Sequence, residues 1–530
     1  MSGKRLVLFS VLFLAAIAVS VGVFALFADI GEKKSEGRQY PLMLAELSDA
    51  NPDFEVWGRN FPSHLDAYKR MEKATDTPTD FGGNLPYSKL IRYPQLTTLW
   101  AGYAFAVDFN EERSHYYTQI DQMETMRNNK AYLNAHGLGA FKGQPGACMN
   151  CHSGWAPELI RQMGWEDFNG KPYWETIKQI EAKHGGDVHG AKLGSTCADC
   201  HSPQDMSLRI TRPAYVNAMV ARGYEADERQ GLKATRAEMR SHVCQQCHVE
   251  YYFQGKNSLL TFPWTEWEKD EPFRIEMMDA YYDAVKAGGV FEKDWVHRDT
   301  KAPMIKVQHP EAELYSSGVH ARSGVSCADC HMPYKREGAN KITEHFIASP
   351  LNNINASCKT CHAQSEKELG DRVSFIQQTT ANGLRQSETA LLSLIADLKT
   401  ARAELAKHPK FAALADPKAQ EAEISKALQT PLELHRKASM RWDFVASENS
   451  TGFHSPQEAS RILGQSMEMA RRGQIETANA LAAYGITLKL TPAAKAPGAP
   501  KPIELHHAPV GSAPPAKLIA VDRATDPLEY

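Results

Sequence analysis

Five Cys-x-x-Cys-His motifs contain all ten cysteines of this 530-residue chain. The spacing is typical of covalent haem attachment, in which two thiols add to the porphyrin and the adjacent histidine binds the iron. Zinc sites pair two Cys-x-x-Cys units or add further histidines, and a thioredoxin-like site needs only one such motif. The sequence therefore predicts five c-type haems, bound at Cys148, Cys151 and His152; Cys197, Cys200 and His201; Cys244, Cys247 and His248; Cys327, Cys330 and His331; and Cys358, Cys361 and His362.

The composition agrees with a protein built around large cofactors. Charged residues make up 23% of the chain, and the mean hydropathy is −0.45. Five macrocycles would supply much of the apolar core that the chain itself lacks. The formal net charge is −3, and some of the 60 lysines and arginines are expected to neutralise haem propionates. No basic block indicates binding of nucleic acid.

The motifs are unevenly spaced, so they do not form a tandem array of haem repeats. After His362 the pattern becomes helical, and we expect helices over 366–405, 418–447 and 456–484, with Pro417 and Pro456 near helix starts. The fold class is therefore mainly α: a multihaem cytochrome c fold with few strands and long C-terminal helices. The expected parts are a signal or anchor (1–30), a haem-binding catalytic body (31–365), a long-helix region that dimerises (366–488) and a Pro/Ala-rich tail (489–530).

The N-terminus carries an export signal or a membrane anchor. A short basic segment precedes an apolar run from Leu6 to Ala28. A cleaved signal has an apolar region of about 7–15 residues, whereas about 20 residues suffice to cross a bilayer. Both outcomes stay open at this stage. Because haem attachment occurs outside the cytoplasm, either outcome places the body on the periplasmic side of the cytoplasmic membrane.

Histidine is abundant enough to supply second iron ligands. The chain has 20 histidines, of which five belong to the motifs. A six-coordinate haem needs one further ligand, so up to five other histidines could serve. Spacing alone does not say which ones.

Several segments resemble the pentahaem cytochrome c nitrite reductases, which form ammonium. The most specific are 244–257, with its Glu-Tyr-Tyr run, and 302–310, with its Lys-Val-Gln-His run. Segments 318–333, 100–127, 441–443 and 454–458 are also similar to that family. The resemblance extends from about residue 40 to residue 488.

The resemblance implies which histidines bind the irons. It makes four haems bis-histidine electron carriers, with His201 paired to His345, His248 to His115, His331 to His454 and His362 to His320. The haem at Cys148 and Cys151 would keep an open distal face. That face would be lined by Arg127, Tyr251 and His309.

The resemblance also implies a calcium site beside this haem. Its ligands would be the side chains of Glu250 and Gln308 and the carbonyl groups of Tyr251 and Lys306. Calcium prefers such oxygen ligands, and it would hold the Tyr251 and His309 segments in place.

The chemistry implied is the reduction of nitrite to ammonium with six electrons and eight protons. Arg127 and His309 would donate hydrogen bonds to nitrite, and His309 could relay protons near neutral pH.

Each of these residue roles has an alternative. Arg127 could pair with a propionate, Tyr251 could be a packed aromatic, His309 could be a distal ligand, and Glu250 and Gln308 could be polar loop residues.

One residue departs from the family pattern. Most members have lysine after the second cysteine of the first motif, where this chain has His152. A histidine variant exists in the family, so the implied function stands. The reactive haem then has to be identified by its surroundings, because its motif is like the other four.

Two other functions remain possible from the sequence. One is a reductase of hydroxylamine, sulfite or tetrathionate on the same scaffold, and the other is an electron carrier with every haem six-coordinate. The resemblance further implies a membrane multihaem quinol dehydrogenase or a soluble cytochrome as electron donor. It also implies a homodimer formed by the long helices.

Overall fold

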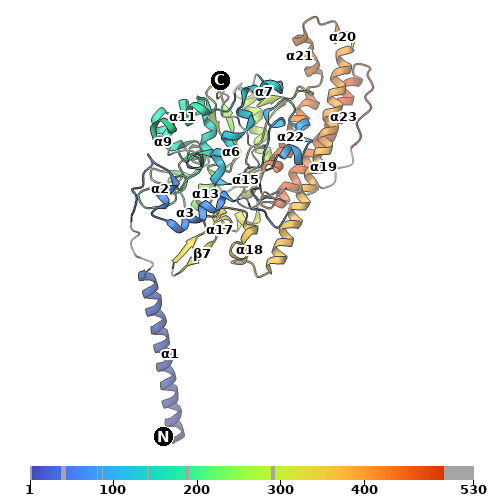
Figure 1. Cartoon of the computed structure of the whole chain (residues 1–530). Coiled ribbons are helices and arrows are strands. Elements are labelled where there is room, and N and C mark those ends of the chain that lie inside the picture. Colours follow the sequence, from blue (N-terminus) through green and yellow to red (C-terminus); the bar gives the residue numbers. More distant parts are fainter. Residues whose placement is uncertain are drawn as a thin grey trace.

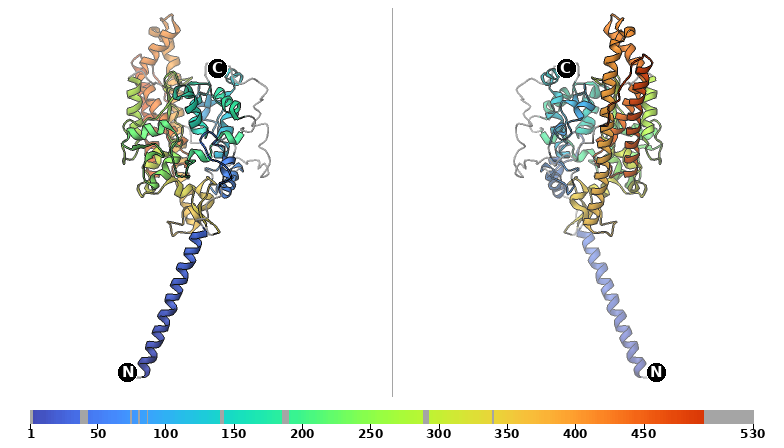
Figure 2. Two further views of the ribbon diagram at one scale, coloured as in Figure 1. Left: turned by 90° about the vertical axis from the view of Figure 1, so that its left-hand side faces the viewer. Right: turned by 90° about the vertical axis from the view of Figure 1, so that its right-hand side faces the viewer.

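The computed structural model describes residues 3–36, 43–73, 75–79, 81–85, 87–139, 143–184, 190–287, 293–338 and 340–493. Helix α1 (Gly3–Glu36) stands apart from the body of the molecule (Figures 1 and 2), and its described side chains are exposed. Within α1, residues Gly3–Gly31 are long and apolar enough to cross a membrane. The predicted tail lies outside the described residues from position 494 onward.

In its described residues, the body is a set of short helices joined by loops, with four small hairpins. The helices are α2 (Phe54–Gly58), α3 (Pro62–Lys69), α4 (Lys89–Arg92), α5 (Leu96–Leu99), α6 (Thr118–Glu124), α7 (Lys130–Ala135), α8 (Met149–His152), α9 (Ala156–Met163), α10 (Trp165–Gly170), α11 (Tyr173–His184), α12 (Pro213–Ala221), α13 (Arg236–Gln245), α14 (Ile275–Ala287), α15 (Glu311–Ser316), α16 (Val319–Arg322), α17 (Cys327–His331) and α18 (Ile354–Ser357). The antiparallel hairpins are β1–β2 (Glu225–Asp227, Gly231–Lys233), β3–β4 (Tyr252–Gln254, Leu259–Thr261), β5–β6 (Trp295–Val296, Pro303–Met304) and β7–β8 (Tyr334–Glu337, Asn340–Thr343). The predicted mainly helical fold with few strands is confirmed.

Three long helices pack along one side of this body (Figure 1): α19 (Glu366–Lys407), α22 (Gln429–Ser447) and α23 (Pro456–Ala482). Helix α19 begins at Ser365, whose hydroxyl accepts the N–H of Glu368 while the Glu368 carboxylate accepts the N–H of Ser365. Such a reciprocal cap satisfies two backbone donors at a helix start. Leu391, Leu394 and Leu398, at helical spacing on α19, are fully buried in the shared core.

The helix expected over 418–447 is two helices. Helix α21 (Pro417–Ala427) ends, Leu428 leaves the helical conformation, and α22 starts at Gln429. Pro431 lies in the first turn of α22, where its missing N–H does no harm. In one continuous helix the same proline would leave a carbonyl in the preceding turn without its donor. Helix α20 (Pro409–Ala412) completes the tip of this region.

Helix α22 also ties the long helices to the body. Arg441 is almost fully buried, and its guanidinium pairs with Asp279 of α14 at 2.5 Å. The next two residues, Trp442 and Asp443, are also buried, and Asp443 accepts the N–H of Val307. The long helices therefore form one wall of the structure around the site described below.

Two glycines of α23 provide a matched test of this packing. A Cβ on Gly473 would lie 2.8 Å from Leu394 of α19, whereas a Cβ on Gly464 would meet nothing within 4 Å. Alanine is favoured over glycine inside a helix by roughly 0.8–1 kcal/mol, but overpacking a core costs typically about 1–3 kcal/mol. We expect Gly464→Ala to stabilise the holoprotein and Gly473→Ala to destabilise it, as measured by denaturant unfolding. Equal gains in the two variants would contradict the observed α19–α23 contact.

Candidate active site and cofactor cavity

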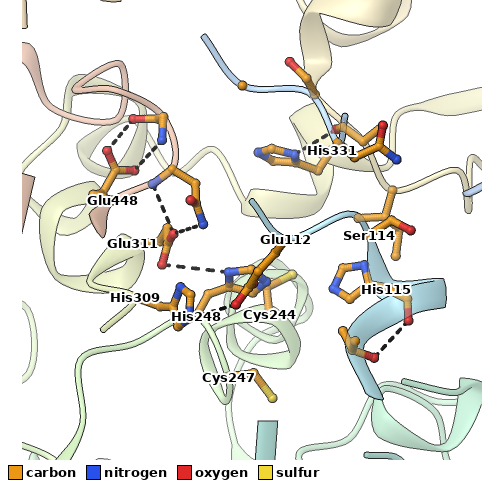
Figure 3. Close-up of a pocket in the computed structure, with 18 of the residues that line it drawn as sticks. Glu112, Ser114, His115, Cys244, Cys247, His248, His309, Glu311, His331 and Glu448 are labelled. Carbon is orange, nitrogen blue, oxygen red and sulfur yellow. Dashed lines mark hydrogen bonds and ion pairs between the residues drawn. The ribbon is translucent and has the colours of Figure 1, made fainter. Parts of the chain in front are cut away.

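One cavity of about 2540 Å³ runs through the body, and part of it is shown in Figure 3. This volume is several times the about 300–1,000 Å³ of an ordinary small-molecule pocket. All ten cysteines and the five motif histidines line it. The low aliphatic content of the sequence thus corresponds to a core with a large space for cofactors.

The cysteines form a connected series along this cavity. None of the ten is in a disulfide. The thiols of Cys151 and Cys247 lie close enough to shift each other's pKa, and so do those of Cys244 and Cys327. Further along, Cys330 lies in the electrostatic field of Cys358. Groups attached at these motifs would therefore be neighbours in the order of the first, third, fourth and fifth motifs.

The second motif joins this series as a branch, because Cys200 lies in the electrostatic fields of Cys247 and Cys244.

Local caps hold two of the motifs. Thr196 and Asp199 form a reciprocal cap over the second motif, and Ser326 and Asp329 do the same for the fourth. Each cap fixes the turn that carries the two thiols.

Four motif histidines face a second histidine across the cavity. The ring centroids are separated by 6.1 Å for His115 and His248, 6.2 Å for His201 and His345, 6.2 Å for His320 and His362, and 6.5 Å for His331 and His454. An imidazole nitrogen binds a first-row metal at about 2 Å, so two axial rings on one metal have centroids about 6 Å apart. The residues present thus fit four iron atoms with two histidine ligands each.

The fifth motif histidine has a different environment. In the part of the chain that the structure describes, no second histidine ring stands at this spacing from His152. Its Nδ1 lies 3.0 Å from the carbonyl of Thr118, and burial lowers its pKa. A neutral ring held by that carbonyl leaves Nε2 free for a metal.

The three predicted catalytic side chains gather around this first motif. Arg127 and Tyr251 are close enough to the Cys148 thiol to influence it electrostatically, and His309 does the same to His152. All three line the cavity. Burial raises the pKa of Tyr251 well above its usual value, so its phenol stays protonated and can donate a hydrogen bond.

Neighbouring groups orient two of these side chains. The Arg127 guanidinium lies 3.9 Å over the Phe105 ring and donates to the carbonyl of Asp108 at 2.9 Å. Nε2 of His309 lies 3.7 Å from a carboxylate oxygen of Glu112, which also projects into the cavity (Figure 3). Arginine and histidine donors at an open metal position can bind and protonate a small oxyanion.

The segment before His309 is held by three carboxylates from different parts of the chain. Asp294 accepts the N–H of Lys306 at 2.7 Å, Asp443 accepts that of Val307 at 2.9 Å, and Glu250 accepts that of Gln308 at 2.6 Å. The Lys306 ammonium lies 3.0 Å from Asp443 and is the counterion of this group. Three carboxylates thus set the position of the backbone that carries His309.

The Lys306 ammonium does not fully compensate this group of buried carboxylates. Glu250 is fully buried, and its Oε1 has no hydrogen-bond partner. Burial raises the pKa of Glu250 well above its usual value, raises that of Asp294 to about 6, and raises that of Asp443. A calcium ion with oxygen ligands would satisfy the free Oε1 and the excess negative charge.

The predicted calcium ligands adjoin one another in this region. The N–H of Gln308 donates a hydrogen bond to Glu250. Tyr251 directly follows Glu250, and Lys306 lies two residues before Gln308. No group of three or more His, Cys, Asp or Glu side chains arranged to hold a metal occurs among the described residues. The expected set differs from such a group, because it has one carboxylate, one amide and two carbonyl oxygens.

Sequence reasoning did not find several residues that complete the site. Glu112 beside His309, Asp294, and Glu313, which accepts the N–H of Glu250 at 3.0 Å, carried no recognisable pattern. Asp443 lies in the 441–443 segment that resembles the family, yet nothing in that segment indicates a bond to Val307. These contacts join residues that are far apart in the chain.

Comparison with known proteins agrees with the expected fold and resemblance. A family model described as cytochrome c552 matches residues 53–506. Cytochrome c-552 of Bacteroides fragilis is 35% identical over 477 residues, which cover 90% of this chain and 87% of that protein. Cytochrome c-552 of Parabacteroides distasonis is 36% identical over 488 residues, covering 92% and 86%.

A solved structure has the same fold. The catalytic subunit of cytochrome c nitrite reductase from Desulfovibrio desulfuricans, described with two calcium sites, superposes with a TM-score of 0.68 at 30% identity. The match covers 83% of this chain and 89% of that one. The predicted multihaem cytochrome fold and the family resemblance are therefore confirmed, and this chain belongs to the cytochrome c552 family.

Proposed function

We propose that this protein reduces nitrite to ammonium at the site around His152, Arg127, Tyr251 and His309. The observation that carries the proposal is the contrast among the five motif histidines. Four face a second histidine at 6.1–6.5 Å, whereas His152 faces a pocket with arginine, tyrosine and histidine donors. A protein that only carried electrons would not need one motif histidine without a partner histidine.

The balanced reaction is NO₂⁻ + 6 e⁻ + 8 H⁺ → NH₄⁺ + 2 H₂O. Haem iron bound by His152 would supply the open coordination position and the electrons. The Arg127 guanidinium attracts and orients the anion. His309 donates protons to the nitrite oxygens as they leave as water, and the protonated Tyr251 donates a further hydrogen bond.

The four histidine pairs hold the haems that deliver electrons to the His152 site. We assign His248 with His115, His201 with His345, His331 with His454, and His362 with His320 as their axial ligands. The ring spacings support these assignments. Calcium is assigned to the side chains of Glu250 and Gln308 with the carbonyl groups of Tyr251 and Lys306, supported by the unpartnered Oε1 of Glu250.

The cellular setting proposed follows from the N-terminal helix and the family. The body lies on the periplasmic side of the cytoplasmic membrane, and α1 either anchors it there or is removed as a signal. A membrane multihaem quinol dehydrogenase or a soluble cytochrome supplies the electrons. The long helices α19, α22 and α23 form the homodimer contact; the exposed Phe375 on α19 and Ile475 on α23 support this surface.

The first test is the haem content and the spin state. Mass spectrometry of unfolded protein, made in a host with only the standard haem-attachment machinery, should show five haem additions. Electron paramagnetic resonance should show one high-spin haem beside low-spin haems, because His152 lacks a histidine partner. Four haems, with Cys148 and Cys151 free, would refute the loading of this motif. Five low-spin haems would refute the open site.

The second test concerns His309. Replacing it with asparagine should lower nitrite reduction by roughly 10²–10⁴, the usual contribution of a positioned proton donor, while the haem count stays unchanged. Ammonium yield with a reduced viologen dye measures the effect. His136, an exposed histidine that directly follows α7, provides the control, and His136→Asn should keep wild-type activity. Wild-type turnover in His309→Asn would remove this residue from the site.

The third test concerns calcium. Glu250→Ala should lower the calcium content of protein purified without chelator, together with its activity, since the only carboxylate of the proposed site is lost. Elemental analysis and ammonium yield are the measurements. Glu225→Ala, on the exposed strand β1, is the control and should change neither. If wild-type protein contains no calcium, the calcium assignment is wrong.

A further inference from the structure

Three of the paired histidines, and the unpaired His152, have a neutral group next to the ring nitrogen Nδ1. Nδ1 lies at hydrogen-bond distance from a backbone carbonyl in four cases: His152 with Thr118, His201 with Met206, His331 with Ala348 and His345 with Thr343. His454 is different. Its Nδ1 lies 2.5 Å from a carboxylate oxygen of Glu448. Among the paired rings, His454 has the shorter carboxylate contact; the Nδ1 of His248 lies 3.8 Å from a carboxylate oxygen of Glu311, beyond hydrogen-bond distance.

The setting of Glu448 is built and buried. It follows the last residue of α22, and 2% of its surface is exposed. Its carboxylate accepts the N–H of Ser450 at 3.1 Å, the hydroxyl of Ser450 at 2.7 Å and the N–H of Gly452 at 3.3 Å. These three donors hold the carboxylate in one position. Among the described residues, its one ion-pair contact is His454.

The turn that holds Glu448 allows little adjustment. Gly452 has a φ of +81°, and a Cβ there would collide with the Thr380 side chain of α19. The N–H of His454 is bonded to the Ser450 hydroxyl at 2.9 Å, so both partners of the ion pair are attached to one serine. The carboxylate and the ring are therefore fixed relative to each other.

A carboxylate on the outer nitrogen of an axial histidine makes the ring a stronger donor to the metal. Such second partners raise ligand basicity and tune the metal that the ring binds. A stronger anionic donor favours ferric over ferrous iron. The carbonyl partners of His201, His331 and His345 have this effect only weakly, because they carry no net charge.

The proposal for Glu448 follows from this contact. We propose that Glu448 is a positioning residue that acts through His454 and lowers the reduction potential of the haem attached at Cys327 and Cys330. The inference depends on the pairing of His454 with His331, which face each other at 6.5 Å. It does not depend on which substrate the His152 site reduces.

The place of this haem in the series gives the low potential a role. Cys327 adjoins Cys244 of the third motif, and Cys330 adjoins Cys358 of the fifth. The third motif in turn adjoins the first through Cys247 and Cys151. A low-potential haem at the fourth motif accepts an electron last. Because Glu448 lies 2.5 Å from His454 and Glu311 lies 3.8 Å from His248, the third-motif haem is the more easily reduced of the two, so an electron shared between them resides next to the active site.

The test is a potentiometric titration of the holoprotein and its Glu448→Gln variant. Glutamine keeps acceptor and donor groups for the turn but removes the charge. The reduction equilibrium of one low-spin haem should shift roughly tenfold toward the ferrous form, the lower end of what loss of such a partner costs. For a one-electron couple this is a rise of about 59 mV. The electron paramagnetic resonance signal of that haem should move, and the other haems should keep theirs.

Glu344→Gln is the matched control. Glu344 directly precedes His345, but its carboxylate bonds Arg70 and the N–H of Phe346. This variant should leave the haem at Cys327 unchanged. Wild-type potentials in Glu448→Gln would overturn the proposal, and so would an equal shift of the same haem in both variants.

If Glu448→Gln does not fold, a second variant and a measurement on the wild-type protein still test the proposal. Ser450→Ala removes the hydroxyl bonds that fix the carboxylate to the ring and keeps the charge of Glu448. It should raise the potential of the fourth-motif haem by less than Glu448→Gln does, and an unchanged potential would count against the proposal. Wild-type protein in which all low-spin haems titrate at one potential would overturn the proposal without any variant. Neither measurement uses nitrite, so their failure is distinct from failure of the proposed function.

Discussion

The fold depends on covalent anchoring of large rings by short helical turns. Each Cys-x-x-Cys-His motif can hold a porphyrin only if its two thiols and its imidazole face one space, and all of them do face the same cavity. The rest of the body follows from this requirement. Short helices and loops can place many side chains around closely spaced rings, whereas an extended sheet cannot, and the strands are accordingly limited to small hairpins.

The site around His152 shows how one motif becomes different from four others of the same sequence pattern. Its own residues do not distinguish it. The difference comes from what lies opposite: among the described residues no second imidazole stands at the spacing of the four histidine pairs, and Arg127, Tyr251 and His309 line that space instead. The backbone before His309 is in turn placed by Asp294, Asp443 and Glu250. Reactivity is therefore determined by segments that are distant in sequence from the motif itself.

The sequence predicted the haem motifs, the helical class and the long C-terminal helices well, because each depends on local patterns. It also separated loop from helix at Pro417 and Pro456, where proline marks a helix start. The break at Leu428 was missed, since two adjacent helical patterns look like one. The roles of Glu112, Asp294 and Glu448 could not be predicted, because each is created by a tertiary contact. Pairing of the histidines required the resemblance, as nothing in their spacing selects partners.

The histidine pairs join distant parts of the chain, and this bears on assembly. His115 precedes all five motifs and faces His248 of the third, whereas His454 follows all five and faces His331 of the fourth. A chain emerging from a membrane pore therefore exports its fourth motif long before the residue that completes it. In the proposed assignment, that haem has one protein ligand until the segment before α23 is exported. The attachment enzymes thus meet an open, unfolded segment, and closure by the C-terminal helices marks the end of maturation.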